Sequence, residues 1–162
     1  DRGGPLRLTP APGVTSIDRL GLLAAALWWG SLGAVGAWVV PLLFAHLPTP
    51  AMAGSMAAKL FSAQTWVALG AGLALLMVLR PRDGAVRMDA AGGVLGWILA
   101  GMLLALVSEF AVAPRIVARQ DLRLWHSVGS ALYALQWLAA GATLWRLATP
   151  PARPGLSPGD PS

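Results

Sequence analysis

The stretch LVSEFAVAPRIVARQDLRLWHSVGSALYALQW, residues 106–137, joins two apolar runs through a short link that is dense in charge. Glu109 lies near the end of the first run, and His126 lies near the start of the second. Pro114 disfavours helical backbone at the residue before it, so the first run should end near residue 113. The stretch therefore predicts a helical hairpin with two ionisable side chains close to its connection.

The rest of the chain also alternates between long apolar runs and charged links. Of its 162 residues, 56% are hydrophobic and only 12% are charged, which is far more apolar than a soluble domain. A bilayer core takes roughly 20 helical residues to cross, and the uncharged runs cover residues 20–45, 60–79, 90–108 and 124–145. We therefore predict an all-α fold, an integral membrane four-helix bundle over residues 20–147, with helices at about 20–44, 60–79, 91–113 and 124–147.

The segments outside these helices are rich in Pro, Gly and Arg. Residues 1–19 and 148–162 are predicted to be a flexible N-terminal tail and a disordered Pro-rich tail. Residues 80–89 form a hydrophilic link. Within the first helix, Pro41 should kink or end the last turn, because proline lacks a backbone N–H group.

The Lys and Arg residues predict the orientation in the membrane. An even number of helices puts both tails on one side, and eight of the twelve Lys and Arg residues fall on that side. They are Arg2, Arg7, Arg19, Arg80, Arg82, Arg87, Arg146 and Arg153. By the positive-inside rule, both termini should be cytoplasmic. The other side holds Lys59, Arg115, Arg119 and Arg123, the last three spaced to lie on one face of a short interfacial helix.

The composition excludes several classes of function. The chain has no cysteine, so it has no disulfide, thiolate metal site or cysteine nucleophile. Its basic residues are scattered over both sides of the membrane without an aromatic patch that would stack bases, which argues against a nucleic-acid partner. No nucleophile, base and acid occur together, so we do not expect an enzyme.

Polar side chains gather near the outer ends of the predicted helices. An acidic group in a membrane helix is costly unless it is paired, so Glu109 should bond to Arg115, Arg119 or His126. His126, Ser130 and Tyr133 share one helical face, which should point into the bundle. The predicted structural polar cluster comprises Gln64, Glu109, Arg115, Arg119, His126, Tyr133 and Gln136.

Two functions are compatible with this cluster. In the first, it fixes the helices in a protein that has a structural or interaction role in the membrane, with the lipid bilayer, other membrane proteins or a second copy as partners. In the second, His46, Glu109 and His126 handle protons or hold a metal ion, with Met52 or Met56 favouring copper. Apart from such an ion, no cofactor is expected.

A weak internal repeat pairs Phe44 and Ala45 with Phe110 and Ala111, each followed by a proline, at Pro48 or Pro114. Two parallel helical hairpins would produce such a repeat. Chance would produce these few matched residues at least as readily.

Three stretches resemble a known family: ALWWGSLGAVGAWVVPLLFAHLP, AGSMAAKLFSAQTW and SEFAVAPRIVARQDLRLWHSVGSALYALQW. They are similar to the bacterial domain of unknown function 4149 family, which is itself similar to the vertebrate transmembrane protein 205. The resemblance covers roughly residues 20–147. It implies a four-helix membrane protein and brings no established activity.

Overall fold

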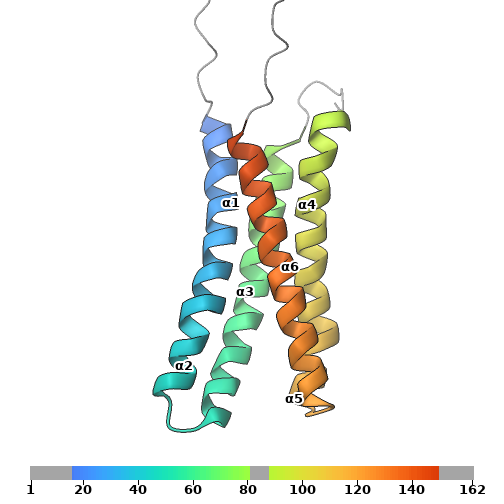
Figure 1. Ribbon diagram of the computed structural model, residues 1–162. Coiled ribbons are helices and arrows are strands. Elements are labelled where there is room, and N and C mark those ends of the chain that lie inside the picture. The colour runs from blue at the N-terminus through green and yellow to red at the C-terminus, as the bar shows by residue number, and fades with distance from the viewer. Residues whose placement is uncertain (1–15, 81–87, 150–162) are drawn as a thin grey trace, which may run out of the picture.

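The computed structural model describes residues 16–80 and 88–149, all of them helical or in short connections. The expected N-terminal tail and Pro-rich C-terminal tail lie almost entirely outside these residues, as does most of the hydrophilic link. Four helical rods stand side by side, and α1 begins at the same end of the bundle at which α6 stops (Figure 1). The predicted all-α four-helix fold is confirmed.

The first rod consists of α1 (Ser16–Ala34), the π-helix η1 (Val35–Val39) and α2 (Val40–His46). The second is α3 (Pro50–Val78). The third consists of α4 (Met88–Val107), the π-helix η2 (Ser108–Val112) and α5 (Ala113–Val117), and the fourth is α6 (Leu122–Ala148). Three spans are long and apolar enough to cross a membrane, Arg19–His46, Pro50–Val78 and Gly93–Val117. The fourth rod is as long as these but less apolar, because α6 contains His, Tyr, Gln and three Trp residues.

Both prolines that were expected to disrupt helices lie inside continuous rods. Pro41 and Pro114 each follow a π-helix, with one residue between them. A proline ring clashes with the carbonyl four residues earlier, and the wider π turn, which bonds over five residues, relieves that conflict. The expectation that the third helix ends before Pro114 is therefore wrong, because helical structure continues to Val117.

The second rod begins at Pro50 rather than near residue 60. Thr49 lies just before it, and its side-chain oxygen accepts a hydrogen bond of 3.2 Å from the backbone N–H of Met52. Proline is favoured at the first helical position, where its missing N–H group costs nothing. Residues 46–59, read from the sequence as a loop, are therefore mostly the first turns of α3.

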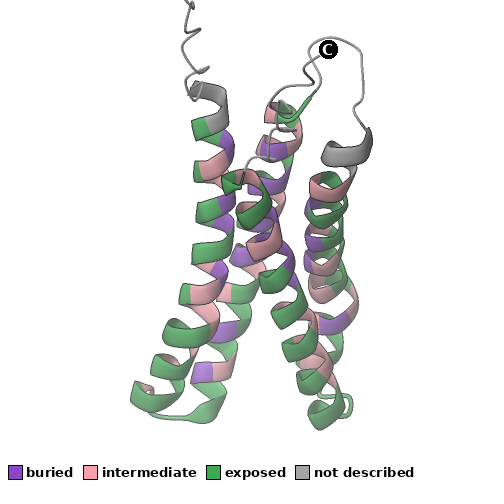
Figure 2. Cartoon of the chain, turned by 45° about the horizontal axis from the view of Figure 1, so that its top comes forward, coloured by how far each residue is buried: buried purple, intermediate pink, exposed green. Residues whose placement is uncertain are grey.

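The buried core lies where the rods converge. Ala25, Trp28 and Leu32 of α1 are completely buried, and they pack with Ala68 and Leu75 of α3. From α4 and α6 the core receives Ile98, Ala105 and Ala140. The two hairpins, α1–α3 and α4–α6, diverge toward the end that carries α2 and α5, where exposed residues predominate (Figure 2).

The two hairpins are related by an internal repeat. The same number of residues separates η1 from η2 and Pro41 from Pro114. This shift in sequence also relates three buried residues of α1 to three buried residues of α4: Ala25 to Ile98, Trp28 to Gly101, and Leu32 to Ala105. With a shift one residue shorter, the buried Gln64 and Ala68 correspond to the buried Gln136 and Ala140. The repeat expected from the sequence, which paired Phe44 and Pro48 with Phe110 and Pro114, is therefore wrong, because the structural correspondence pairs Pro41 with Pro114.

Corresponding residues contact each other across the centre of the bundle, as residues near a two-fold axis do. Trp28 lies so close to its counterpart Gly101 that a Cβ atom there would stand 2.6 Å from the indole. Phe61 of α3 meets its counterpart Tyr133 edge to face, with ring centroids 5.1 Å apart. The bundle thus has approximate two-fold symmetry about an axis parallel to its rods.

Gly101→Ala should destabilise the bundle, because its methyl group would clash with the buried indole of Trp28. Overpacking of a core costs about 1–3 kcal/mol. Gly96→Ala in the same helix is the matched control, since nothing lies within 4 Å of a Cβ atom there, and it should raise stability by up to about 1 kcal/mol. Thermal unfolding of both variants in detergent measures the difference, and equal stabilities would contradict the close contact.

Candidate functional site

The principal polar contact within the bundle joins the two hairpins near the point where they diverge. Ser62 of α3 donates a hydrogen bond of 2.6 Å from Oγ to Oε1 of Glu109, which lies in η2. Both side chains are half-buried. This separation lies within the usual range for a hydroxyl that donates to an oxygen. Glu109 thus pairs with the opposite hairpin.

The π-helix η2 sets the position of Glu109. A π turn holds one residue more than an α turn, and such turns occur frequently at functional sites. Ser108, which precedes Glu109, has a buried Oγ without a hydrogen-bond partner among the described residues. The segment therefore holds a bonded carboxylate and, at the preceding residue, a buried hydroxyl without a partner among the described residues.

A second polar contact lies between α1 and α3. Gln64 is 5% exposed, and its Nε2 donates a hydrogen bond of 2.9 Å to Oγ of Ser31. The Ser31 hydroxyl in turn donates to the carbonyl oxygen of Trp28, 3.0 Å away. This contact ties the two rods of the first hairpin together.

Tyr133 makes the third polar contact, from α6 to α1. Its hydroxyl donates a hydrogen bond of 2.8 Å to the carbonyl oxygen of Leu32. A Cβ atom at Gly36 would lie 2.7 Å from Cε1 of Tyr133, so the ring requires glycine at that position. Gly36 is the counterpart of Glu109 in the internal repeat. At this position the first hairpin therefore has a glycine, which makes room for the Tyr133 ring, whereas the second hairpin has Glu109.

The approximate symmetry leaves one buried amide without a partner. Gln136 corresponds to Gln64 and is 3% exposed, yet its Nε2 has no hydrogen-bond partner among the described residues. The counterpart of Ser31 is Leu104, which cannot accept a hydrogen bond. The absence of a hydroxyl at Leu104 accounts for the unpaired amide.

The structure separates several residues that the sequence grouped into one polar cluster. His126 and Ser130 are exposed, because the hairpins diverge at this end and leave the first turns of α6 uncovered. Arg115 lies over the ring of Trp125, 4.5 Å from its centroid, and also donates to the carbonyl of Ala111. The expected pairing of Glu109 with one of these groups is replaced by its bond to Ser62.

The expected row of arginines on one interfacial helix is also wrong. α5 ends at Val117, and Arg119 has a positive φ of 54°, which breaks the helix before Arg123. Arg119 and Arg123 are exposed at the turn into α6. There Asp121 is the N-cap, and its Oδ1 accepts from the backbone N–H of Leu124 at 3.3 Å.

Among the described residues, the structure does not bring His46, Glu109 and His126 together as one group of metal ligands. In the part of the chain that the structure describes, no group of three His, Cys, Asp or Glu side chains could hold a metal ion. His46 is exposed at the end of α2, and its Nδ1 lies 3.0 Å from the carbonyl oxygen of Leu42. Met52 and Met56 are exposed on the first turns of α3.

Sequence reasoning missed the part played by Ser31. This residue is the only hydroxyl in the apolar run 20–45, and a lone polar group in such a run should face another helix rather than lipid. That signal could have identified it. Its partner Gln64 could not have been chosen without the structure.

Ser62→Ala and Glu109→Leu should be coupled in a double-mutant cycle, because each removes the hydrogen bond. We expect a coupling energy of about 0.5–2 kcal/mol, the range for a hydrogen bond inside a membrane protein. Glu109→Gln should be tolerated better than Glu109→Leu, because an amide can still accept from Ser62. Unfolding free energies in detergent measure these effects, and additive single-variant effects would rule out a stabilising bond.

Gln64→Leu and Gln136→Leu form a matched pair at corresponding positions. Gln64→Leu should cost about 1 kcal/mol, because it removes the bond to Ser31. Gln136→Leu should be neutral or stabilising, because the amide that it removes is buried without a partner. The same unfolding assay compares them, and an equal loss in both variants would mean that Gln136 has a bonding partner after all.

More than half of the chain matches a known protein family. No curated protein and no solved structure matches the chain. Residues 23–124 match the family described as "Domain of unknown function (DUF4149)", which is more than half of the chain. The match runs from α1 into the first turn of α6 and includes Ser31, Gln64 and the link between Ser62 and Glu109. The chain therefore belongs to the DUF4149 family.

Proposed function

We propose that this protein has a structural or interaction role in the membrane and is not an enzyme. The observation that carries the proposal is the hydrogen bond between Ser62 and Glu109. It uses the half-buried carboxylate to hold one hairpin against the other at the end where they diverge. A group engaged in this way fixes a surface for a partner rather than performing chemistry on a substrate.

The remaining polar groups support the same proposal. Tyr133 is bonded to the backbone of α1, and Gln64 is bonded to Ser31. His46 and His126 are exposed and belong to no metal-binding group in the described residues. Glu109, Tyr133 and Gln64 thus serve contacts between helices, and the partners we propose are the bilayer and other membrane proteins or a second copy.

The proposed setting is a bacterial inner membrane crossed by all four rods, with both termini in the cytoplasm. Support comes from the eight Lys and Arg residues on the side of the tails, against four on the other side. Among the described residues, Arg19, Arg80 and Arg146 lie at helix ends on the side of the tails. The residue pattern that predicted the family also supports a similarity to the vertebrate transmembrane protein 205.

A second candidate is proton handling by Glu109. It is favoured by the position of this carboxylate within a membrane span, where ionisable groups commonly serve in proton relays. The neighbouring Ser108 hydroxyl, which has no partner among the described residues, could extend such a relay. In that function Glu109→Gln abolishes proton movement, whereas a purely structural link survives the same substitution.

The structural role is tested by the separation of the hairpins at their open end. The chain has no native cysteine, so spin labels can be attached at Ser55→Cys on α3 and Ser127→Cys on α6, both exposed. Pulsed electron resonance should give one narrow distance distribution in the otherwise wild-type protein. Glu109→Leu should broaden it toward longer distances, and Glu109→Gln should keep it narrow. Identical distributions in all three proteins would refute the role of Glu109 in holding the hairpins.

A further inference from the structure

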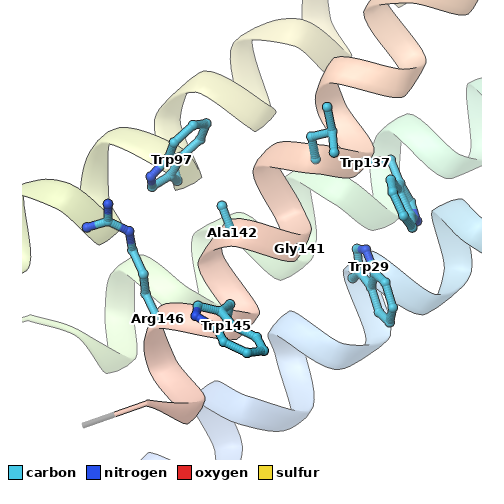
Figure 3. Close-up of a pocket in the computed structure, with 8 residues that line it drawn as sticks. Trp29, Trp97, Trp137, Gly141, Ala142, Trp145 and Arg146 are labelled. Atoms are coloured by element: carbon cyan, nitrogen blue, oxygen red, sulfur yellow. The ribbon is translucent and has the colours of Figure 1, made fainter. Parts of the chain in front are cut away.

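A groove lined by four tryptophans lies on the outer face of α6, away from the link at Glu109. Its volume is about 380 Å³. Its floor is Gly141 and Ala142, and its walls are Trp29 of α1, Trp97 of α4, and Trp137, Trp145 and Arg146 of α6 (Figure 3). Half of the eight tryptophans in the chain therefore line this one groove.

The shape of the groove depends on Gly141. A Cβ atom there would lie 2.9 Å from Nε1 of Trp29, so glycine lets this indole lie against the backbone of α6. Trp29 stacks on Trp137 with ring centroids 5.4 Å apart. On the other side, the Arg146 side chain extends toward α4 (Figure 3), where a Cβ atom at Gly93 would clash with its guanidinium. The groove therefore has an aromatic wall on the α1 side and a cation at the α4 side.

The tryptophans extend too deep to be only an interfacial belt. Tryptophan anchors helices at the level of the lipid headgroups. At 1.5 Å per residue, Trp137 lies about 17 Å from the end of α6, near the middle of a bilayer core of about 30 Å. Arg146 lies about 14 Å along α6 from Trp137. The groove thus runs from a cation at the level of the headgroups toward the middle of the bilayer, over a length similar to the thickness of one leaflet.

We propose that the groove binds one anionic phospholipid of the leaflet on the side of the tails. The guanidinium of Arg146 contacts the lipid phosphate, and an acyl chain lies over Gly141 and Ala142 between Trp97 and Trp137. Arginine suits phosphate because its planar fork of N–H donors matches the phosphate oxygens. Among the described residues that line the groove, none is acidic. This inference rests on the proposed crossing of the membrane by all four rods.

The internal repeat shows that this groove is specific to one hairpin. The counterparts of Trp137, Trp145 and Arg146 in α3 are Thr65, Leu73 and Ala74, and the counterpart of Trp29 is Met102. The corresponding face of α3 therefore has neither the aromatic walls nor the cation. Trp66, which lies on α3 and is 63% exposed, supplies a control tryptophan that contacts lipid without a groove.

Quenching of tryptophan fluorescence by brominated acyl chains tests the proposal, because bromine quenches only on contact. The full chain is reconstituted in phosphatidylcholine vesicles that contain a small fraction of brominated phosphatidylglycerol or, separately, brominated phosphatidylcholine. We expect phosphatidylglycerol to be bound about fivefold more strongly, the preference that one basic residue near the surface confers. Arg146→Gln should abolish the preference, and Trp137→Leu should reduce the quenched fraction.

Two controls separate this site from general effects. Trp66→Leu should keep the preference for phosphatidylglycerol. Arg80→Gln, at the same end of the bundle, should also keep it, and an equal loss with Arg146→Gln would show a nonspecific surface charge and overturn the site.

The remaining outcomes are also distinguishable. If brominated lipid of neither kind quenches the protein, the proposed crossing of the membrane is wrong, and with it the lipid site. If both lipids quench equally and the protein associates with itself in a way that Trp137→Leu prevents, a second copy covers the groove and the lipid proposal is overturned. Equal quenching without self-association also overturns it.

Discussion

The bundle depends on the contact between Trp28 and Gly101 at its centre. Helices in lipid gain little from the hydrophobic effect, so they associate through close van der Waals packing that small residues permit. Here one hairpin contributes a completely buried indole, and the other contributes a glycine at the corresponding position. A symmetric pair of tryptophans would not fit, and a symmetric pair of glycines would leave a void. The two hairpins therefore carry different residues at the axis, because one large and one small residue together fill the space there.

The same inequality determines the distribution of polar groups. Tyr133 takes the place of Phe61 and bonds to the backbone of α1, whereas Glu109 takes the place of Gly36 and bonds to Ser62. Both polar groups belong to the second hairpin, and each bonds to the first hairpin by different chemistry. The Nε2 group of Gln136 has no partner among the described residues, because the second hairpin has Leu104 where the first has Ser31.

The fold class was predictable from the sequence because uncharged runs of about 20 residues match the length of a helix that crosses a bilayer. The helix bounds at Pro50 and Val117 were not, since proline reads as a break unless an N-cap at Thr49 or a π turn before Pro114 accommodates it. Glu109 was recognised as a group that needs a partner, but Ser62 is far away in the sequence and could be chosen only from the packing. His126 and Ser130 misled because the divergence of the hairpins leaves their face uncovered.

The two π-helices also determine whether corresponding residues of the two hairpins keep pointing in corresponding directions. Each π turn adds one residue, which shifts the direction of every later side chain by about 100° relative to an uninterrupted α-helix. A helical wheel drawn through η1 or η2 therefore assigns the residues beyond it to the wrong face. Because both rods contain this insertion at the same place, the two shifts match and the approximate two-fold relation continues beyond them. A change that removed one π turn alone would set the two halves of the molecule a quarter of a turn or more out of register.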